Sequence, residues 1–201
     1  MKKKSRKTIL TALLFLLLAF SITMPVQAKK RTASTVTSKT SYKNDKEFMT
    51  VRGLDKQKKV VWKYVTSKYP ATELAQTKCV VRKNRVYVFE NSKVMALRKK
   101  DGKCLWTSSP ISPAGHVIRF DEDNNLYVTG YYDTTIYKVS PKGKILWKKS
   151  ISRTGNYWPY KITISGNKVT ILYEMNSKDS SSQKKHKVIL NVKNGKLIKY
   201  S

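Results

Sequence analysis

Histidine, cysteine and carboxylate side chains carry most nucleophilic and hydrolytic chemistry, and this 201-residue chain holds few of them. Its two histidines are His116 and His186. A serine or cysteine nucleophile needs a base within hydrogen-bonding reach, but His116 begins an expected strand and His186 lies among lysines in a soft loop. Hydrolysis by paired carboxylates needs two acids held across the substrate, and the 12 acidic residues fall mostly in turns. We expect no catalytic residues and no enzyme activity.

Metal and cofactor chemistry is as poorly supplied. The two isolated cysteines and two isolated histidines give no metal-ligand spacing. Alternating oxygen ligands in "DEDNN" at 121–125 suggest calcium, but the glycine and the distal bidentate acid of such loops are missing. The same letters form an ordinary hairpin turn. We expect that turn, with no metal and no cofactor.

The two cysteines allow two interpretations. Cys79 and Cys104 are an even count, which permits one disulfide in an exported protein. Both also lie in apolar strand patterns, where a cysteine behaves as a small buried hydrophobe. We favour the second interpretation.

The sequence contains many residues suited to binding, and most of them are cationic. The chain holds 42 Lys and Arg against 12 Asp and Glu, a formal net charge of +30, which attracts polyanions. Many lysines lie in turns beside a recurring tryptophan motif, so equivalent turns on one rim would form a cationic ring that binds phosphate-rich polymers in a salt-sensitive way. The candidates are Lys99, Lys100, Lys103, Lys142, Lys144, Lys148 and Lys149. The alternative is a solvated lysine surface without a ligand.

Aromatic residues form a second group of candidates. The stretches "GYYD" at 130–133 and "NYWPY" at 156–160 place Tyr131, Tyr132, Tyr157 and Trp158 in expected turns. Exposed rings flanked by cations can stack on sugars or on unpaired bases. The alternative, which we favour, is that these rings fill space between structural repeats.

The first 28 residues have the pattern of an export signal. The basic start "MKKKSRK" precedes an apolar run, and "VQA" at 26–28 offers small residues where a signal peptidase cleaves. We expect cleavage after Ala28. The alternative is an uncleaved anchor, because residues 8–26 form an uncharged stretch of 19 residues, barely enough to span a bilayer.

The elements that position these residues are expected to be strands. After the signal, short runs rich in Val, Ile and Tyr alternate with clusters of Gly, Asn, Asp and Ser, which is typical of strands and turns. Residues 29–46 form either a basic polar linker or a leading strand, and residues 176–187 a long hairpin loop.

A motif that ends in tryptophan organises the strands into repeats. It occurs as "DGKCLW" at 101–106 and "KGKILW" at 142–147, and more weakly as "NGKLIK" at 194–199. Trp62, Trp106 and Trp147 lie 44 and 41 residues apart, and a period near forty with strand chemistry predicts one four-stranded sheet per repeat. In one unit the strands are expected at 77–82, 86–90, 93–98 and 103–107. We expect the tryptophans to fill the gaps between neighbouring sheets.

The predicted fold is therefore all-β. It is a small β-propeller or propeller-like array of about four four-stranded repeats, three complete and one partial, over residues 47–201.

The repeat resembles a known family. The stretches "VMALRKKDGKCLW" (94–106) and "TIYKVSPKGKILW" (135–147) are similar to the repeat of the PQQ-like β-propellers, relatives of the quinoprotein dehydrogenase fold, and "VILNVKNGKLIK" (188–199) is a fainter match. The resemblance covers about 48–199. Quinone-dependent enzymes of this fold carry about eight blades, and some carry an adjacent cysteine pair; this chain has neither. The resemblance therefore implies the non-enzymatic branch, whose members are binding or assembly scaffolds.

These observations predict an exported, non-catalytic binding scaffold. Its charge and signal suggest a secreted or wall-associated protein of a Gram-positive bacterium, with a lysine-rich rim that binds an anionic cell-surface polymer. The alternative partner is another exported protein, for which the repeats act as an assembly module. A third hypothesis is a truncated relic of a quinoprotein-like enzyme. We expect neither a nucleic-acid partner nor stable membrane insertion after cleavage.

Overall fold

The computed structural model describes residues 31–70, 78–90, 93–108, 111, 117–129, 135–150, 157–176 and 183–201. The expected signal peptide, His116, Tyr131 and Tyr132 lie outside these residues. The chain divides into a leading unit, Met1–Arg31, and a second unit, Thr32–Ser201, which contains every strand given below. No helix among the described residues has the length and apolar character needed to cross a membrane.

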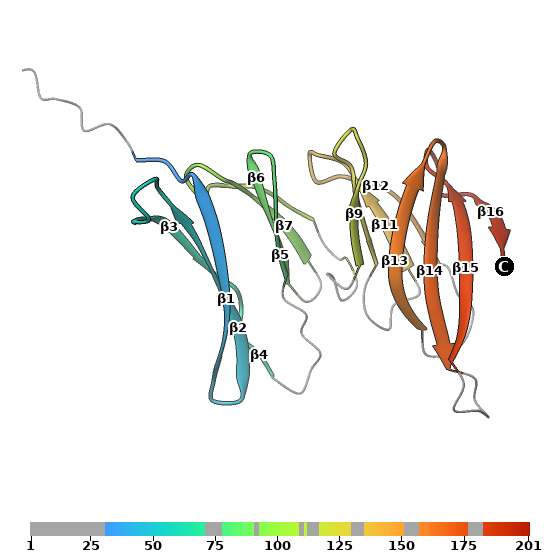
Figure 1. Ribbon diagram of the computed structural model, residues 1–201, viewed down its shortest axis with the longest axis horizontal. Coiled ribbons are helices and arrows are strands. Elements are labelled where there is room, and N and C mark those ends of the chain that lie inside the picture. Colours follow the sequence, from blue (N-terminus) through green and yellow to red (C-terminus); the bar gives the residue numbers. More distant parts are fainter. Residues whose placement is uncertain are drawn as a thin grey trace, which may run out of the picture. The chain divides into compact units, whose positions relative to one another are not determined.

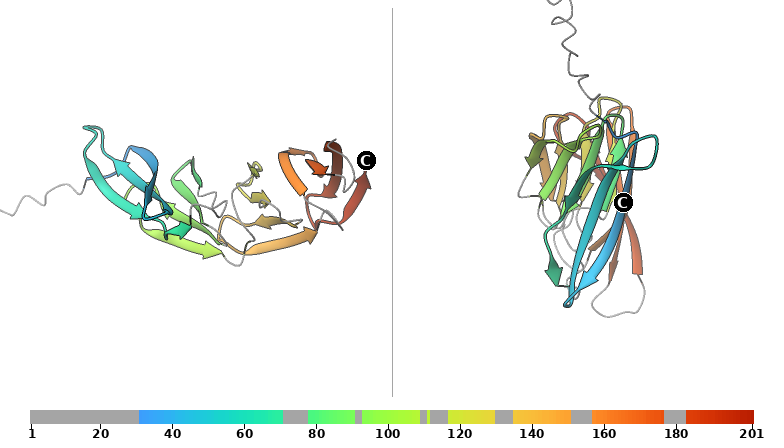
Figure 2. Two further views of the ribbon diagram at one scale, coloured as in Figure 1. Left: turned by 90° about the horizontal axis from the view of Figure 1, so that it is seen from below. Right: turned by 90° about the vertical axis from the view of Figure 1, so that its left-hand side faces the viewer.

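The described part of the second unit is built from antiparallel sheets that follow one another in chain order (Figures 1 and 2). Sheet 1 contains β1 (Thr35–Lys43), β2 (Lys46–Leu54), β3 (Val60–Val65) and β4 (Tyr69–Pro70). Sheet 2 contains β5 (Lys78–Arg82), β6 (Arg85–Glu90), β7 (Lys93–Arg98) and β8 (Cys104–Ser108). Sheet 3 contains β9 (Val117–Phe120), β10 (Leu126–Thr129), β11 (Thr135–Val139) and β12 (Ile145–Ser150). Sheet 4 contains β13 (Tyr157–Ser165), β14 (Lys168–Asn176), β15 (Gln183–Asn191) and β16 (Leu197–Tyr200).

The prediction of an all-β array of four-stranded units is confirmed. Sheets 2, 3 and 4 are meanders whose strands pair in sequence order. Sheet 1 is the partial unit: β1, β2 and β3 stand where the other sheets have their second, third and fourth strands, and the short β4 pairs with the start of β2. The same β-bulge recurs near the end of each third strand, after Gly53, Ala96, Lys138 and Ile189.

Two expectations about local structure need correction, and one open alternative is decided in favour of a leading strand. Thr35–Lys43, within the segment expected to be a linker or a leading strand, forms a strand paired with β2 along its whole length. The long hairpin loop expected at 176–187 is shorter, because β15 already begins at Gln183. Tyr157 and Trp158 are not in a turn but open β13, with their backbones paired to those of Met175 and Glu174. At 35–43 and 183–187, pairing with a neighbouring strand supplies the order that a polar local sequence does not predict.

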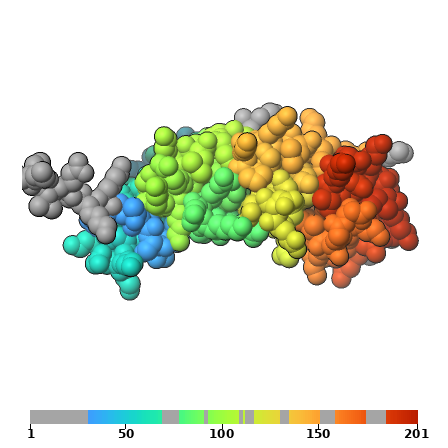
Figure 3. Space-filling model, turned by 90° about the horizontal axis from the view of Figure 1, so that it is seen from above, coloured from blue at the N-terminus to red at the C-terminus, as the bar shows by residue number. Residues whose placement is uncertain are grey.

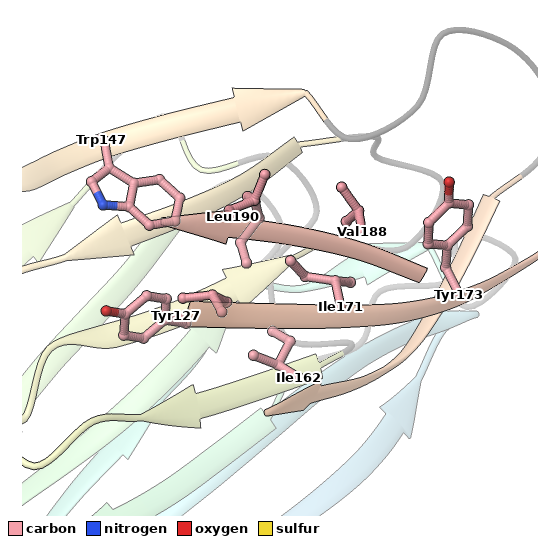
Figure 4. Packing of buried hydrophobic residues seen from close by; sticks show 9 residues of the cluster. Tyr127, Trp147, Ile162, Ile171, Tyr173, Val188 and Leu190 are labelled. Atoms are coloured by element: carbon pink, nitrogen blue, oxygen red, sulfur yellow. The ribbon is translucent and has the colours of Figure 1, made fainter. Parts of the chain in front are cut away.

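Hydrophobic clusters join consecutive sheets. One cluster unites Met49, Val51 and Trp62 of sheet 1 with sheet 2, and a second unites sheets 2 and 3. The third lies between sheets 3 and 4, where Trp147 and Tyr127 meet the aliphatic side chains of β14 and β15 (Figure 4). Because sheets 2 and 3 are covered on both faces, their central strands β6, β7, β10 and β11 are apolar almost without alternation.

Candidate functional site

At each junction a tryptophan of the fourth strand reaches the following sheet. Its indole Nε1 donates a hydrogen bond to a backbone carbonyl near the turn before that sheet's last strand. The bonds join Trp62 to Lys99 (2.8 Å), Trp106 to Pro141 (2.8 Å) and Trp147 to Val192 (3.0 Å). Two of the indoles also meet a tyrosine of their own sheet edge-on, with ring centroids 5.9 Å apart. The repeated tryptophan therefore ties one sheet to the next.

The glycine of the motif is the surface on which that indole rests. A Cβ at Gly102, Gly143 or Gly195 would come within 2.6 to 2.8 Å of the preceding sheet's tryptophan ring. Their φ angles lie between +69° and +86°, a region that residues with a side chain rarely adopt. Each glycine is thus required both by its turn and by the ring packed on it.

The turns that connect first to second strands, and third to fourth strands, gather at one end of the sheets, the end viewed in Figure 3. We call this the turn end. A groove of about 420 Å³ lies there, with Arg82 of sheet 2, Arg119 and the acidic turn 121–123 of sheet 3, and Gly166 of sheet 4 in its lining. A second hollow of about 320 Å³ adjoins it between sheets 2 and 3 and shares Arg82 and Asp123.

Part of this groove is fixed by internal contacts. The Arg82 guanidinium donates to Asn124 Oδ1 and to the Asp121 carbonyl, both at 3.1 Å, and lies 5.0 Å from the Phe120 ring centroid. Arg85 donates to the Pro141 carbonyl at 2.6 Å. These arginines bind sheet 2 to the turns of sheet 3, so they hold the groove in shape.

Asp121 is likewise committed to the fold. Its carboxylate accepts hydrogen bonds from the backbone and side-chain amides of Asn125, both at 2.8 Å, and from the Tyr127 hydroxyl at 3.2 Å. Burial, with Asp121 adding to it, raises the pKa of Tyr127. The carboxylate also lies 3.9 Å from the buried Lys138 ammonium. Residues 121–125 thus form a hydrogen-bonded turn, with Asn124 at a φ of +63°.

The groups left exposed on the groove are Arg119, Glu122 and Asp123. Sequence reasoning missed Arg119. It pairs with Tyr127 at a register position where sheet 2 has the partly buried Val80. The change from an apolar residue to a cation is hidden in the sequence, because Val80 lies 26 residues before Trp106 and Arg119 lies 28 residues before Trp147.

The structure divides the predicted lysine candidates between turns and an edge strand. Lys99, Lys100 and Lys103 lie in or beside the turn from β7 to β8, and Lys142 and Lys144 in or beside the turn from β11 to β12. Lys148 and Lys149 are consecutive residues of β12, so their side chains leave opposite faces. Lys99 is half-buried and the other six are exposed.

Two expectations about reactive side chains change. His186 is not in a loop: it lies in β15, and its ring stacks on Tyr173 with centroids 5.3 Å apart. Cys79 is half-buried, but Cys104 is exposed because β8 is an edge strand, and both thiols are free. Burial raises the pKa of the Cys79 thiol to about 11, while a hydrogen bond with Ser38 acts in the opposite direction.

Comparisons with known proteins agree with this architecture. A family model described as "Outer membrane protein assembly factor BamB" matches residues 17–185. BamB from Moraxella catarrhalis is similar in structure, with a TM-score of 0.50 and 17% identity over 81% of this chain and 47% of that one. Hydrazine synthase from Kuenenia stuttgartiensis gives a TM-score of 0.52 and 12% identity over 78% of this chain and 45% of that one. No curated protein sequence matches significantly.

At these identities the structural similarity shows the fold, and the chain spans about half the length of these two structures. The family match covers most of the chain and confirms the resemblance read from the repeat motif. The chain therefore belongs to the family of PQQ-like repeat proteins whose model is described as outer membrane protein assembly factor BamB.

Proposed function

We propose that this protein is a non-catalytic scaffold that works outside the cytoplasm and docks another exported protein in the groove at its turn end. The family model is named for an assembly factor, and the expected export signal at residues 1–28 supports an extracytoplasmic location. Within the described structure, His186 and Asp121 serve packing and turn formation, which supports a binding role over a catalytic one.

The observation that carries this proposal is the mixed charge of the groove. Arg119 is exposed beside Glu122 and Asp123, on a frame held by Arg82 and Asp121. A phosphate-rich polymer would be repelled by the two carboxylates, whereas a protein surface can offer groups of both signs. Because these internal hydrogen bonds already fix the frame, little conformational freedom is lost when a partner docks.

The test is capture of a partner from the exported fraction by the tagged protein, in 50 and 500 mM salt. We expect a stoichiometric partner that is retained at the higher salt. Arg119→Glu should reduce its capture at least tenfold. The matched variant, Lys142, Lys144, Lys148 and Lys149 all changed to Glu, should keep it. If the Arg119→Glu variant captures the partner as well as the unmodified protein does, the proposal is wrong.

The anionic polymer remains a second candidate because six of the seven candidate lysines are exposed. Under this alternative, long-chain polyphosphate binds the unmodified protein. Its affinity falls by orders of magnitude between 50 and 200 mM salt, because the release of counterions contributes less free energy at higher salt. The variant with all four lysines changed to Glu would then lose polyphosphate binding, whereas Arg119→Glu would weaken that binding only slightly. The two sets of variants thus separate the candidates.

A further inference from the structure

We call the face of each sheet that is turned toward the next sheet its leading face. Residues paired across the strands form rows on this face, and one row includes the tryptophan. The rows read Val36–Gly53–Trp62 in sheet 1, Val80–Tyr87–Ala96–Trp106 in sheet 2 and Arg119–Tyr127–Lys138–Trp147 in sheet 3. In sheet 4 the row is Thr163–Thr170–Ile189–Lys199. This row of sheet 4 therefore lacks the tyrosine and tryptophan that sheets 2 and 3 have in it.

The neighbouring row of sheet 4 is also cationic. Lys161 and Lys187 flank Leu172 across β13, β14 and β15, and both lysines are exposed. At the position of Lys187, sheet 2 has the fully buried Val94. The leading face of sheet 4 also carries Glu174, beside Lys185. It is therefore a polar face with an excess of positive charge.

The opposite end shows the same change on the receiving face, the one turned toward a preceding sheet. On their second, third and fourth strands, sheets 2, 3 and 4 present Val88–Met95–Thr107, Val128–Tyr137–Lys148 and Ile171–Val188–Tyr200. Sheet 1 presents Thr37–Arg52–Lys63 at the same register. Arg52 is exposed, so β2, at the third-strand position of sheet 1, carries a cation where the other sheets have Met95, Tyr137 and Val188. Lys63 is not distinctive, because sheet 3 has Lys148 at the same position.

The two contact points of the tryptophan junction are altered at the ends as well. Lys58 stands four residues before Trp62, where the other units have glycine, and it keeps the positive φ, at +60°. Lys199 stands where the other units have tryptophan. A side chain at position 58 leaves no flat glycine surface for an indole, and Lys199 offers no indole to place there.

We propose that sheets 1 and 4 are terminal caps, so the array stays open: sheet 4 does not dock on sheet 1, either of the same chain or of a second copy. Docking would press Arg52 against Lys187 and Lys199, at positions where the internal sheets have no exposed cation. Buried, unpaired charges of one sign oppose such an interface. Repeat arrays keep their end units soluble by giving them polar outer faces.

The test builds a junction between two copies of the chain that resembles the junctions between its internal sheets. One variant gives sheet 4 the leading-face residues of sheet 2, through Thr170→Tyr, Lys187→Val and Lys199→Trp. The other gives sheet 1 the receiving residues of sheet 2, through Arg52→Met and Lys58→Gly. Each variant keeps one native cap, so each should be monomeric alone. Mixed in equal amounts, they should form a complex of twice the molar mass by light scattering.

Mixing either variant with the unmodified protein is the matched control and should leave the mass unchanged. Far-ultraviolet circular dichroism and the thermal midpoint establish that each variant is folded before mixing. If the folded variants do not associate, the ends are not blocked by these residues and the proposal is wrong. It is also wrong if the unmodified protein associates with itself.

Discussion

Single residues explain why the motif recurs along the chain. The glycine and the tryptophan in one copy face different neighbours: Gly143 receives the Trp106 ring from sheet 2, whereas the Trp147 ring rests on Gly195 of sheet 4. Each motif therefore carries one half of two separate junctions. The spacing between copies of the motif equals the number of residues between consecutive junctions. Local strand propensity alone therefore does not explain this spacing.

Burial at the residue scale also predicts the reactivity of the two thiols. The pKa of Cys79 is raised to about 11 by burial, so at pH 8 very little of it is thiolate, the nucleophilic form. We expect iodoacetamide to label the exposed Cys104 at least ten times faster than Cys79 at pH 8. The rate at Cys79 should then rise about tenfold per pH unit toward pH 10. Peptide mass spectrometry after timed labelling measures both; equal rates at pH 8 would count against the structure.

At the scale of elements, strands with an apolar face were the most predictable. The expected strands at 77–82 and 93–98 correspond to β5 and β7 within one residue, because turns with Gly and Asn bound short apolar runs. The long outer hairpins were less predictable. β1 is polar and largely exposed, and the start of β15 is polar in sequence. Both are ordered by backbone pairing that no local apolar pattern indicates.

The candidate site was less predictable than the fold for the same reason. The lysine candidates were chosen from turns beside the motif, yet the groove depends on residues from three sheets. Arg119 lies within a strand, between Ile118 and Phe120, and its exposure depends on how sheet 3 is covered by its neighbours. Charge counts indicated a cationic protein but could not identify which cation faces a hollow.

The junction turns give a matched test at the element scale. Gly143→Ala adds a Cβ that would lie 2.6 Å from the Trp106 ring, whereas Gly166→Ala adds one with nothing within 4 Å. Both positions have a positive φ, so each substitution costs about 1 kcal/mol of backbone strain. Gly143→Ala should cost a further 1 to 3 kcal/mol, roughly the cost of overpacking. Urea unfolding measures the difference, and equal losses at the two glycines would show that the indole does not depend on the turn.

At the scale of the whole molecule, the described core is a chain of pairwise junctions. Among the described residues, each hydrophobic cluster spans two consecutive sheets, so each sheet is stabilised mainly by its immediate neighbours, as in other repeat proteins. Such an array keeps a rigid row of turns at one end while individual turns vary in sequence. That arrangement suits a docking surface better than an enclosed catalytic site.

Site-specific photocrosslinking in the producing cells tests directly whether a protein partner docks at the turn end. A benzophenone amino acid replaces Glu122, on the lip of the groove, or Tyr42, which is 68% exposed near the opposite end of sheet 1. We expect one light-dependent adduct with an exported protein from position 122 and none from position 42. Adducts from neither position, or equal adducts from both, would contradict docking at the turn end.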